Sequence, residues 1–237
     1  MNLAVLTDII KETKSNWRFI FEDPLLDSIK MIPGQLVQLC SKPGDEESVV
    51  RNYSVASWQD GTNKFELIVT NLEGGQMCDY LFKEAKVGDE FVYRGPMGVF
   101  TLPEDITDRE VFFVSTGSGI SPFRSMINDV FISKKPFKKL KLFFGTRTEE
   151  DLCYRNELEF IQHCLPGFEY IPTLSRENKE GFKTGYVHDH YLSLIDKMDE
   201  KPLVYFCGWD RMIREGRDHL AKRGFEMTKD IRVEIFG

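Results

Sequence analysis

The sequence predicts two domains: an N-terminal antiparallel six-stranded β-barrel and a C-terminal α/β domain with a parallel, Rossmann-like sheet. The chain has 237 residues, which is enough for two ordinary domains. In the first part, short apolar or alternating runs are separated by turn-prone residues, as in small barrels. From Asp108 onward, similar runs alternate with helical patterns, as in α/β proteins. We therefore place the boundary between residues 1–103 and residues 104–237.

Six segments of the first domain have the pattern of strands. They are Leu3–Ile10, Trp17–Glu22, Gln35–Ser41, Val49–Ser57, Phe65–Asn71 and Glu90–Arg94. Turns are expected between many of them, for example at Pro33-Gly34, Pro43-Gly44 and Asp60-Gly61. A helix is expected at Met77–Ala85, after the pair Gly74-Gly75.

The second domain alternates strands and helices. The expected strands are Val111–Ser115, Leu140–Gly145, Phe168–Thr173, Leu203–Cys207 and Ile231–Phe236. The expected helices lie near residues 121–132, 155–164, 186–195 and 209–222. This order predicts a parallel sheet of about five strands, in which ligands bind at the carboxyl ends of the strands.

The turn after the first strand of this sheet, residues 116–119, has the composition of an anion site. Two glycines let a phosphate approach the backbone, and the helix that follows offers free N–H groups and the positive end of its dipole. Ser121 is the expected N-cap, with Pro122 at the first helical position. Glycine also occurs in such turns for purely steric reasons. Other strand ends carry Gly, hydroxyl, Arg or Cys residues as well, which favours a ligand site.

Two segments of the barrel are candidates for the same chemistry. Arg51 and Tyr53 project from one face of their strand and Ser54 from the other, so a phosphate and a flat ring system fit the first pair. The alternative is an exposed arginine and a half-buried tyrosine with no ligand. The turn at residues 74–78 is a second candidate phosphate site, and its alternative is an ordinary loop.

Composition narrows the class of protein. The net charge of −7 argues against general affinity for nucleic acid. The apolar runs are too short for a transmembrane helix, and the first residues lack the pattern of a signal peptide. Five scattered cysteines without a C-x-x-C pair indicate a reducing compartment, and no zinc or iron–sulfur site is expected. We therefore expect a cytoplasmic protein without a bound metal.

Five motifs in order resemble the ferredoxin–NADP reductase superfamily, over essentially the whole chain. They are Arg51-x-Tyr53-Ser54, Gly74-Gly75 entering a helix, Gly95-Pro96-Met97-Gly98, Thr116-Gly117-Ser118-Gly119-Ile120-x-Pro122 and Cys207-Gly208-x-x-x-Met212. The ending Val233-Glu234-Ile235-Phe236 is similar to that of ferredoxin–NADP(H) reductases proper. The resemblance implies a flavin-binding barrel, an NADP-binding α/β domain, and electron transfer between NADP(H) and ferredoxin or flavodoxin through FAD. We also expect a monomer, although the sequence does not determine the oligomeric state.

The resemblance implies roles for individual residues. Ser54, Cys207, Glu234 and Phe236 would form the catalytic site, with Phe236 stacked on the flavin where the nicotinamide must land. The flavin and the nucleotide would be held by Arg51, Asn52, Tyr53, Ser54, Val69, Gly74, Gly75, Gln76, Met77, Cys78, Thr116, Gly117, Gly119, Pro122, Arg147, Ser175, Arg176, Cys207, Gly208, Met212 and Phe236. Cys78 departs from the family, which usually has Ser or Thr there, and a thiol is the poorer hydrogen-bond donor.

The choice of nicotinamide cofactor depends on two arginines. Arg147 and Arg176 each follow a strand, and Arg binds a compact dianion such as the 2′-phosphate of NADP. Ser175-Arg176-Glu177 resembles the corresponding segment of NADP-specific members. We therefore expect NADP. The alternative is an NADH-dependent reductase component serving an oxygenase or cytochrome. A third hypothesis is a non-catalytic flavin-bearing subunit. The sequence does not distinguish FAD from FMN as the flavin.

A basic run at residues 134–141 contains five lysines in an otherwise acidic chain. Such a run could attract an acidic electron-carrier protein, although basic runs more often form solvated loops.

Overall fold

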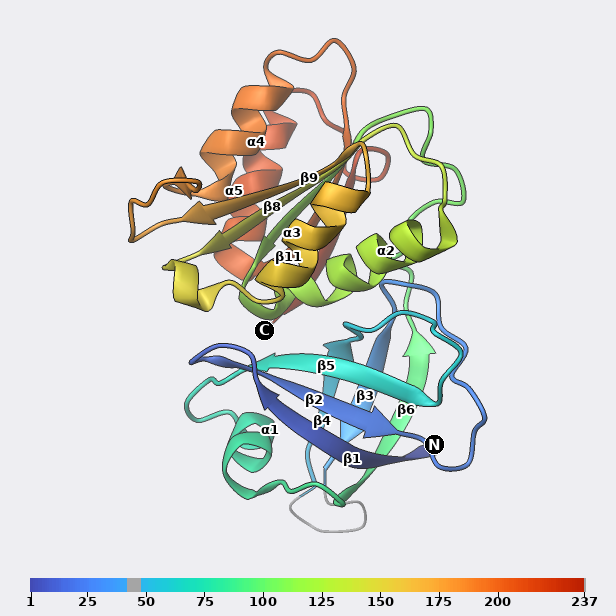
Figure 1. The fold of residues 1–237 in the computed structure, drawn as a ribbon. Helices are drawn as coiled ribbons and strands as arrows, with labels where there is room; N and C mark the ends of the chain where they lie inside the picture. Colours follow the sequence, from blue (N-terminus) through green and yellow to red (C-terminus); the bar gives the residue numbers. More distant parts are fainter. Residues whose placement is uncertain (42–47, 237) are drawn as a thin grey trace.

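The computed structural model describes residues 1–41 and 48–236, except for the side chain of Phe236. Two six-stranded sheets, each with its own helices, lie one above the other, and the C-terminus lies between them (Figure 1). The N-terminal sheet is antiparallel and the C-terminal sheet is parallel, so the predicted fold class is confirmed.

The N-terminal sheet curls into a barrel. Its strands are β1 (Asn2–Lys11), β2 (Asn16–Glu22), β3 (Leu36–Cys40), β4 (Val50–Ser54), β5 (Lys64–Thr70) and β6 (Glu90–Met97), in the order β4-β3-β6-β1-β2-β5. All six strands were predicted, with ends that differ by a few residues. The expected turn at Pro43-Gly44 lies outside the described residues.

The barrel interior is filled by aromatic and aliphatic side chains from alternate strand positions, among them Phe19, Phe21, Leu67 and Phe91. The predicted helical segment is a short helix, α1 (Gln76–Asp79), which continues as a π-helical turn, η1 (Tyr80–Glu84). It buries Met77 and Leu81 in the barrel core.

The C-terminal sheet consists of β7 (Val111–Thr116), β8 (Leu140–Thr146), β9 (Phe168–Leu174), β10 (Lys183–Thr184), β11 (Leu203–Trp209) and β12 (Ile231–Phe236). The order is β10-β9-β8-β7-β11-β12. Chain order therefore reverses direction at β7, which is where a ligand crevice forms in such sheets. The strand β10 was not predicted, because a strand of two residues leaves no periodic pattern.

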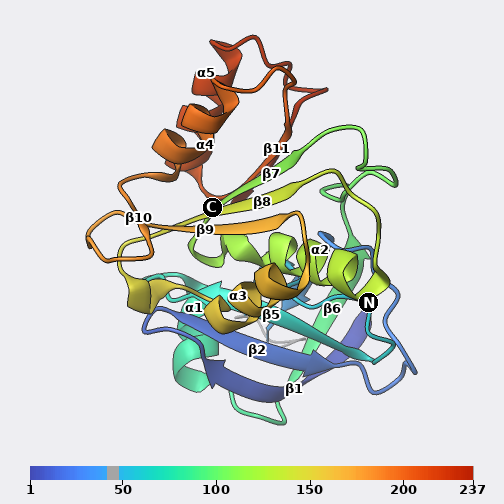
Figure 2. The same ribbon diagram turned by 45° about the horizontal axis from the view of Figure 1, so that its top comes forward.

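Four helices cover this sheet, two on each face. They are α2 (Ile120–Ser133), α3 (Arg155–Cys164), α4 (Val187–Ile195) and α5 (Asp210–Ala221), close to the predicted ranges. Short 3₁₀ turns, η2 (Gly117–Gly119) and η3 (Glu149–Asp151), follow β7 and β8. The view in Figure 2 shows α2 and α3 between the parallel sheet and the barrel, so these helices form much of the contact between the domains.

The start of α2 differs from the prediction at one residue. The helix begins at Ile120, directly after η2, and Gly119 occupies the N-cap position without a side-chain cap. The Ser121 hydroxyl donates to the carbonyl oxygen of Ser118 at 2.7 Å, so Ser121 lies inside the helix and is not its cap. The N–H groups of this first turn are therefore not capped by a side chain, as an anion site requires.

The connection between the domains runs from the end of β6 at Met97 to the start of β7 at Val111. The predicted boundary at residues 103/104 falls within this segment and stays a prediction. Gly34, before β3, has φ +97 and lies against the main chain of Phe100 and the side chain of Met126 on α2. A Cβ atom at Gly34 would come closer to both than real Cβ atoms do, so the barrel and α2 touch here without room for a side chain.

We expect Gly34→Ala to destabilise the protein more than Gly61→Ala does. Both glycines have positive φ, so each substitution carries a conformational cost of about 1–2 kcal/mol. Only the Cβ at residue 34 would meet other atoms, since Gly61 has nothing within 4 Å, and overpacking adds about 1–3 kcal/mol. Urea unfolding of the three proteins measures the difference, and equal losses for the two variants would contradict the tight contact.

Candidate functional site

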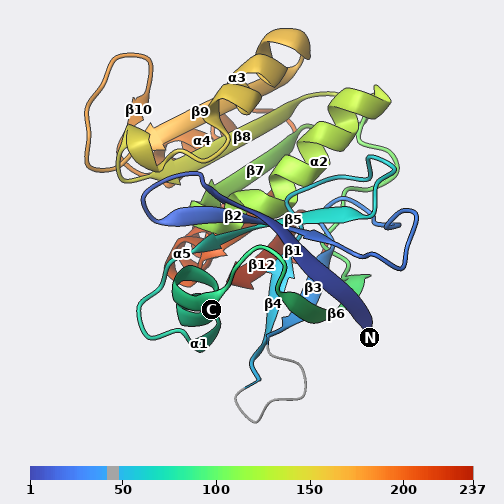
Figure 3. The ribbon, with the colours of Figure 1, turned by 60° about the horizontal axis from the view of Figure 1, so that its bottom comes forward.

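A partly buried carboxylate joins the two domains at the end of the parallel sheet. The Ser54 hydroxyl, at the end of β4 in the barrel, donates to Glu234 Oε1 on β12. Cys207 Sγ on β11 lies 4.0 Å from the same oxygen. Figure 3 shows β12 reaching toward β4, which is how residues 180 positions apart come into contact. The structure thus brings three of the four predicted catalytic residues together. The side chain of the fourth, Phe236, lies outside the described residues.

Burial controls the protonation of this cluster. It raises the pKa of the Glu234 carboxyl, and the hydrogen bond from Ser54 opposes that rise only in part. Burial, together with the nearby Glu234 charge, raises the pKa of the Cys207 thiol well above its ordinary value. A thiol held in its neutral form is a poor nucleophile, so Cys207 contributes a small apolar surface and a weak S–H donor.

The glycine turn after β7 lies beside this cluster. A Cβ on Gly208, which has φ +134, would be 2.5 Å from Thr116 Oγ1. A Cβ on Gly119 would overlap the carbonyl group of Cys207. The Thr116 hydroxyl oxygen also accepts the main-chain N–H of Trp209 at 3.2 Å. Only glycine therefore lets the ends of β7 and β11 approach this closely, and the uncapped start of α2 faces the same turn.

Trp209 and Thr70 lie next to the turn. A Cβ placed on Gly117 would have Trp209 Nε1 at 3.7 Å and Thr70 Oγ1, from the barrel, at 3.8 Å. Trp209 is 57% exposed, so its indole is available to a ligand that lies along the turn. Neither residue was predicted from the sequence. The only signal is that Trp209 directly follows Cys207-Gly208.

The predicted barrel segments come together on the outside of the barrel. Arg51 and Asn52 are both exposed, Tyr53 is half-buried and Ser54 is buried, so exposure does not alternate from residue to residue along β4. Burial raises the pKa of Tyr53, with Cys78 as a further contributor and Arg51 acting in the opposite direction, so these three side chains are neighbours. Arg51 Nη1 donates to the carbonyl oxygen of Val50 at 2.8 Å, and the guanidinium keeps further donors for a phosphate.

The turn before α1 leaves room for a ligand, but one of its side chains does not point outward. Gly74 has φ +80 and nothing within 4 Å of a Cβ built on it, and Gly75 and Gln76 begin α1. The Cys78 thiol donates to the carbonyl oxygen of Thr70 at 3.5 Å. The thiol is thus directed at the end of β5, and any contact of this turn with a phosphate would come from main-chain N–H groups.

Several predicted binding residues have side chains that lie in the cores. Val69 and Met77 are buried in the barrel, and Pro122 and Met212 are buried in the α/β domain. Only their main-chain groups can face a ligand, so their side chains shape the site from behind. Asn52 accepts a hydrogen bond from Gln38 at 3.3 Å.

The two predicted phosphate-reading arginines are neighbours at the carboxyl edge of the sheet. The main-chain N–H of Arg176 donates to the carbonyl oxygen of Arg147 at 2.9 Å, and both side chains are exposed. In the described part of the chain, neither guanidinium has a hydrogen-bond or ion-pair partner. Ser175 donates to the carbonyl oxygen of Thr146, so its hydroxyl is already engaged.

The basic run at residues 134–141 lies elsewhere. It leads into the start of β8, at the amino edge of the sheet, opposite the glycine turn. Lys138, Lys139 and Lys141 form ion pairs with Glu200, Glu110 and Glu169, respectively. Most of this charge is therefore neutralised within the chain and is far from the cluster around Glu234, which weakens the case for partner docking there.

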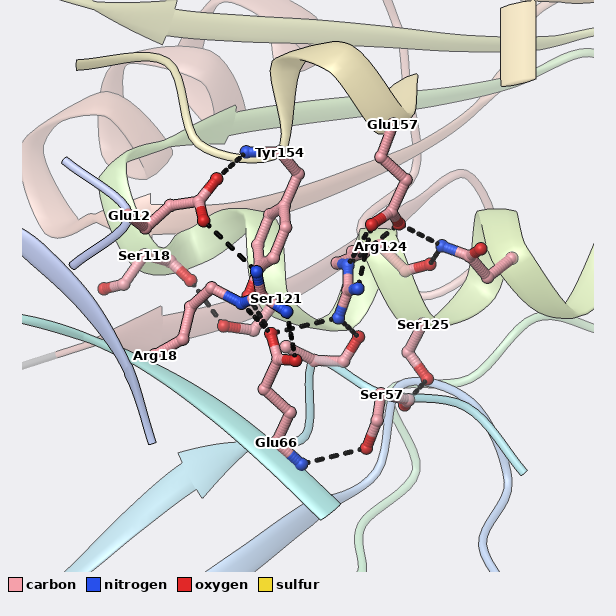
Figure 4. A network of polar contacts seen from close by, with 12 residues as sticks. Glu12, Arg18, Ser57, Glu66, Ser118, Ser121, Arg124, Ser125, Tyr154 and Glu157 are labelled. Carbon is pink, nitrogen blue, oxygen red and sulfur yellow. Dashed lines mark hydrogen bonds and ion pairs between the residues drawn. The ribbon is translucent and has the colours of Figure 1, made fainter. Parts of the chain in front are cut away.

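A second polar cluster across the domain boundary was missed entirely. It contains Arg18 and Glu66 of the barrel with Arg124 and Tyr154 of the α/β domain (Figure 4). The available signal was a charge inside an apolar strand: Glu66 lies within the run Phe65–Val69.

These residues fit a flavin and a nicotinamide dinucleotide. Such ligands carry phosphates, which can bind at the two glycine turns and at the remaining donors of Arg51. They also carry flat rings, which can lie against Tyr53. A Cβ built on Gly117 would have no atom nearer than 3.7 Å, so a ligand can approach the main chain of this turn. The cluster around Glu234, whose carboxyl pKa is raised by burial, lies next to it. Among the described residues, no group of His, Cys, Asp or Glu is placed to hold a metal ion.

Comparison with known proteins agrees with this fit. The profile of the oxidoreductase FAD-binding domain matches residues 3–102, and that of the oxidoreductase NAD-binding domain matches residues 113–218. Ferredoxin–NADP reductase B of Sorangium cellulosum is 37% identical over 210 residues, which are 86% of this chain and 84% of that protein.

Other relatives are components of oxygenases. The electron transfer component of 2-halobenzoate 1,2-dioxygenase from Burkholderia cepacia is 28% identical over 218 residues, 91% of this chain but 62% of that protein. The reductase component DmpP of phenol 2-monooxygenase from a Pseudomonas species is 32% identical over 207 residues, covering 86% of this chain and 57% of that one. The chain thus spans less than two thirds of these two components.

Solved structures share the fold. Ferredoxin NADP⁺ reductase from Neisseria gonorrhoeae, with bound FAD and NADP, superposes with a TM-score of 0.81 at 21% identity, covering 98% of this chain and 97% of that one. The Amycolatopsis cytochrome P450 reductase GcoB superposes with a TM-score of 0.88 at 24% identity, covering 100% and 70%. Over the residues that the structure describes, no helix is both long and apolar enough to span a bilayer.

We expect Ser54→Ala to raise the pKa of Glu234 further, because the variant loses the hydrogen bond that stabilises the charged carboxylate. A ¹³C NMR titration of the glutamate side-chain carboxyls measures this pKa, and Glu234→Gln identifies its signal by removing it. An unchanged or lower pKa in Ser54→Ala would show that the hydroxyl does not act on this carboxyl.

Proposed function

The chain belongs to the ferredoxin–NADP reductase family of FAD- and NAD-binding oxidoreductases, and on that basis we propose that it transfers electrons between NADP(H) and a separate ferredoxin or flavodoxin. The observation that carries the proposal is the cluster of Ser54, Cys207 and Glu234. One member comes from the FAD-binding domain and two come from the NAD-binding domain. The match to a ferredoxin–NADP reductase over 84% of its length supports the choice of partner.

In this proposal the barrel holds FAD. Arg51 would pair with the pyrophosphate, Tyr53 would lie against the isoalloxazine ring, and the main chain at residues 74–78 would hold a phosphate. FAD supplies the exchange between a two-electron hydride donor and a one-electron acceptor. The protein's own task is to bind and orient the two ligands and to exclude water from the space between them.

The residues at the domain boundary perform that task. Ser54 is buried and donates its hydroxyl to Glu234 Oε1, so this donor is satisfied within the protein. Cys207 offers a compact apolar surface against which a nicotinamide ring can lie. The main chain of Phe236 pairs with Trp209 at the carboxyl edge of the sheet, and we place its ring over the isoalloxazine until the nicotinamide displaces it.

The free guanidinium groups of Arg147 and Arg176 support NADP rather than NAD. A 2′-phosphate is a dianion that matches the planar donors of arginine. An NAD site more often offers an acidic side chain to the ribose hydroxyl. Glu177, the residue after Arg176, is engaged, since its Oε2 accepts the main-chain N–H of Glu149 at 2.8 Å.

An NADH-dependent reductase component that serves an oxygenase is the second candidate function. It is favoured by the relatives from dioxygenase and monooxygenase systems, which match over most of this chain. The two candidates share the flavin and the hydride step and differ in the nicotinamide cofactor and in the acceptor.

The test begins with the purified protein. Its flavin is released by heat and identified by chromatography, and turnover with NADPH and with NADH is measured using a dye, a ferredoxin and a flavodoxin as acceptors. We expect FAD, preference for NADPH, and reduction of the carrier proteins. Preference for NADH would favour the second candidate. A colourless protein that reduces no dye would contradict both functions and indicate a binding module.

We expect Arg176→Ala to raise the KM for NADPH by about 10–100-fold and to leave the KM for NADH almost unchanged. The lost contact is a hydrogen bond between charged groups, worth about 1.5–3 kcal/mol, and only NADPH carries the 2′-phosphate. Arg223→Ala serves as the control, because Arg223 pairs with Asp196 within the same domain. Equal effects on both cofactors would mean that Arg176 does not contact the 2′-phosphate.

A further inference from the structure

Arg124 of α2 is a buried charge that reaches into the other domain. It is 4% exposed, and its Nη1 donates to Glu66 Oε1 and to the carbonyl oxygen of Ala56, both in the barrel and both at 3.1 Å. Its Nε and Nη2 donate to Glu157 of α3 at 2.9 and 2.8 Å. The guanidinium also lies over the ring of Tyr154, 4.1 Å from the ring centroid. One side chain thus binds two carboxylates, one from each domain.

Glu66 of β5 is the acceptor on which this contact converges. It is 7% exposed, and Arg18 of β2 donates to both of its oxygens at 2.8 Å. Arg124 and the Tyr154 hydroxyl, at 2.6 Å, add two donors from the other domain. Burial alone would raise the pKa of Glu66, but the two arginines outweigh it, so the pKa is lowered and the carboxylate stays charged.

Two further contacts fix the same surfaces. The main-chain N–H of Tyr154, which has φ +56, donates to Glu12 Oε1 of the barrel at 2.6 Å. The Ser125 hydroxyl, next to Arg124 on α2, donates to the carbonyl oxygen of Ser57 at 2.6 Å. Figure 4 shows these bonds around α2, β5 and the segment before α3. The directions of the bonds differ, so together they resist both sliding and separation of the domains.

The two elements that carry this network also carry the nucleotide site. Arg124 lies five residues beyond Gly119, about 7–8 Å along the helix. Glu66 lies four residues before Thr70, about 13 Å along β5. Thr70 and Gly117 meet at the other end of the same pair of elements. Any rotation of α2 against β5 at the network would therefore move the glycine turn relative to the barrel.

We propose that Arg124 is a positioning residue: through Glu66 it sets the distance and angle between the glycine turn and the flavin face of the barrel, and so the geometry of hydride transfer. This inference rests on the proposed function. A buried ion network adds little net stability compared with apolar packing, because desolvation opposes the charge attraction. Its contribution here is to allow one arrangement of the domains.

The test compares Arg124→Met with Arg223→Met. Arg223 also makes a two-bond contact with a carboxylate, Asp196, at 2.7 and 2.9 Å, but within one domain. For each holoenzyme we measure kcat, the KM for NADPH, and the isotope effect with NADPH deuterated at the transferred position. Flavin content and the Kd for adenosine 2′,5′-bisphosphate report on each binding surface separately. Arg124→Lys and Glu66→Gln complete the set.

We expect Arg124→Met to lower kcat by 10-fold or more and to increase the isotope effect, with flavin content and the Kd for the bisphosphate within twofold of wild type. Arg124→Lys should recover part of kcat, because a lysine can reach one carboxylate, and Arg223→Met should resemble wild type. If Arg124→Met does not fold, Glu66→Gln, which keeps the shape and removes the charge, should show the same pattern. A kcat and isotope effect like those of wild type in the folded variant would overturn the proposal.

Hydrogen exchange gives a readout that does not depend on turnover. In Arg124→Met we expect faster exchange of the main-chain amides at residues 117–120 and 56–57, and unchanged exchange in β9. If wild type shows no reaction with NADPH or NADH, the proposed function fails, while this exchange pattern still tests whether Arg124 positions the turn. Unchanged exchange at residues 117–120 would mean that it does not.

Discussion

The carboxylate of Glu66 is the constraint on which the arrangement of this molecule depends. It is buried, it is charged, and it takes donors from both domains: Arg18 on one side, Arg124 and Tyr154 on the other. Removing one partner of a buried carboxylate destabilises the folded protein by about 3–5 kcal/mol. The domains therefore cannot separate without exposing the Glu66 charge to water or leaving it unpaired. Together with the close packing of α2 against the barrel, this network holds the two domains in one relative position.

The functional site is a consequence of that position. Ser54 and Glu234 meet between the ends of β4 and β12, and neither domain contains the site alone. This second contact consists of a single hydrogen bond, whereas the network around Glu66 contains several. In the proposed function, a nicotinamide ring that enters beside Cys207 would displace side chains at the weaker contact while the stronger one keeps the domains in register. The network around Glu66 would thus hold the domains fixed, and the Ser54–Glu234 contact would adapt to the ligand during the proposed hydride transfer.

Much of this was predictable from the sequence, because it depends on local periodicity. The alternating runs specified the barrel strands, and the strand–glycine–helix pattern at residues 111–123 located the turn at the switch point of the sheet. The short strand β10 has no period to detect, and the expected cap at Ser121 was wrong because the turn is already 3₁₀ at Gly117–Gly119. The Glu66 network could not be predicted, because its bonds between the domains join residues 58 to 142 positions apart, and their meeting is set by tertiary packing. The role of the Phe236 ring over the isoalloxazine stays a prediction, because its side chain lies outside the described residues.

The most direct test of the account is the pKa of Glu234 in Arg124→Met, measured by ¹³C NMR. Burial at the closed domain boundary raises this pKa. If Arg124 holds the boundary closed, its loss should admit water and lower the pKa toward that of an ordinary glutamate. Loss of a positive charge alone acts in the opposite direction, since it disfavours the carboxylate, so the two effects are distinguishable by sign. A pKa that stays raised or rises further would contradict the account, because the site would then be closed without the network.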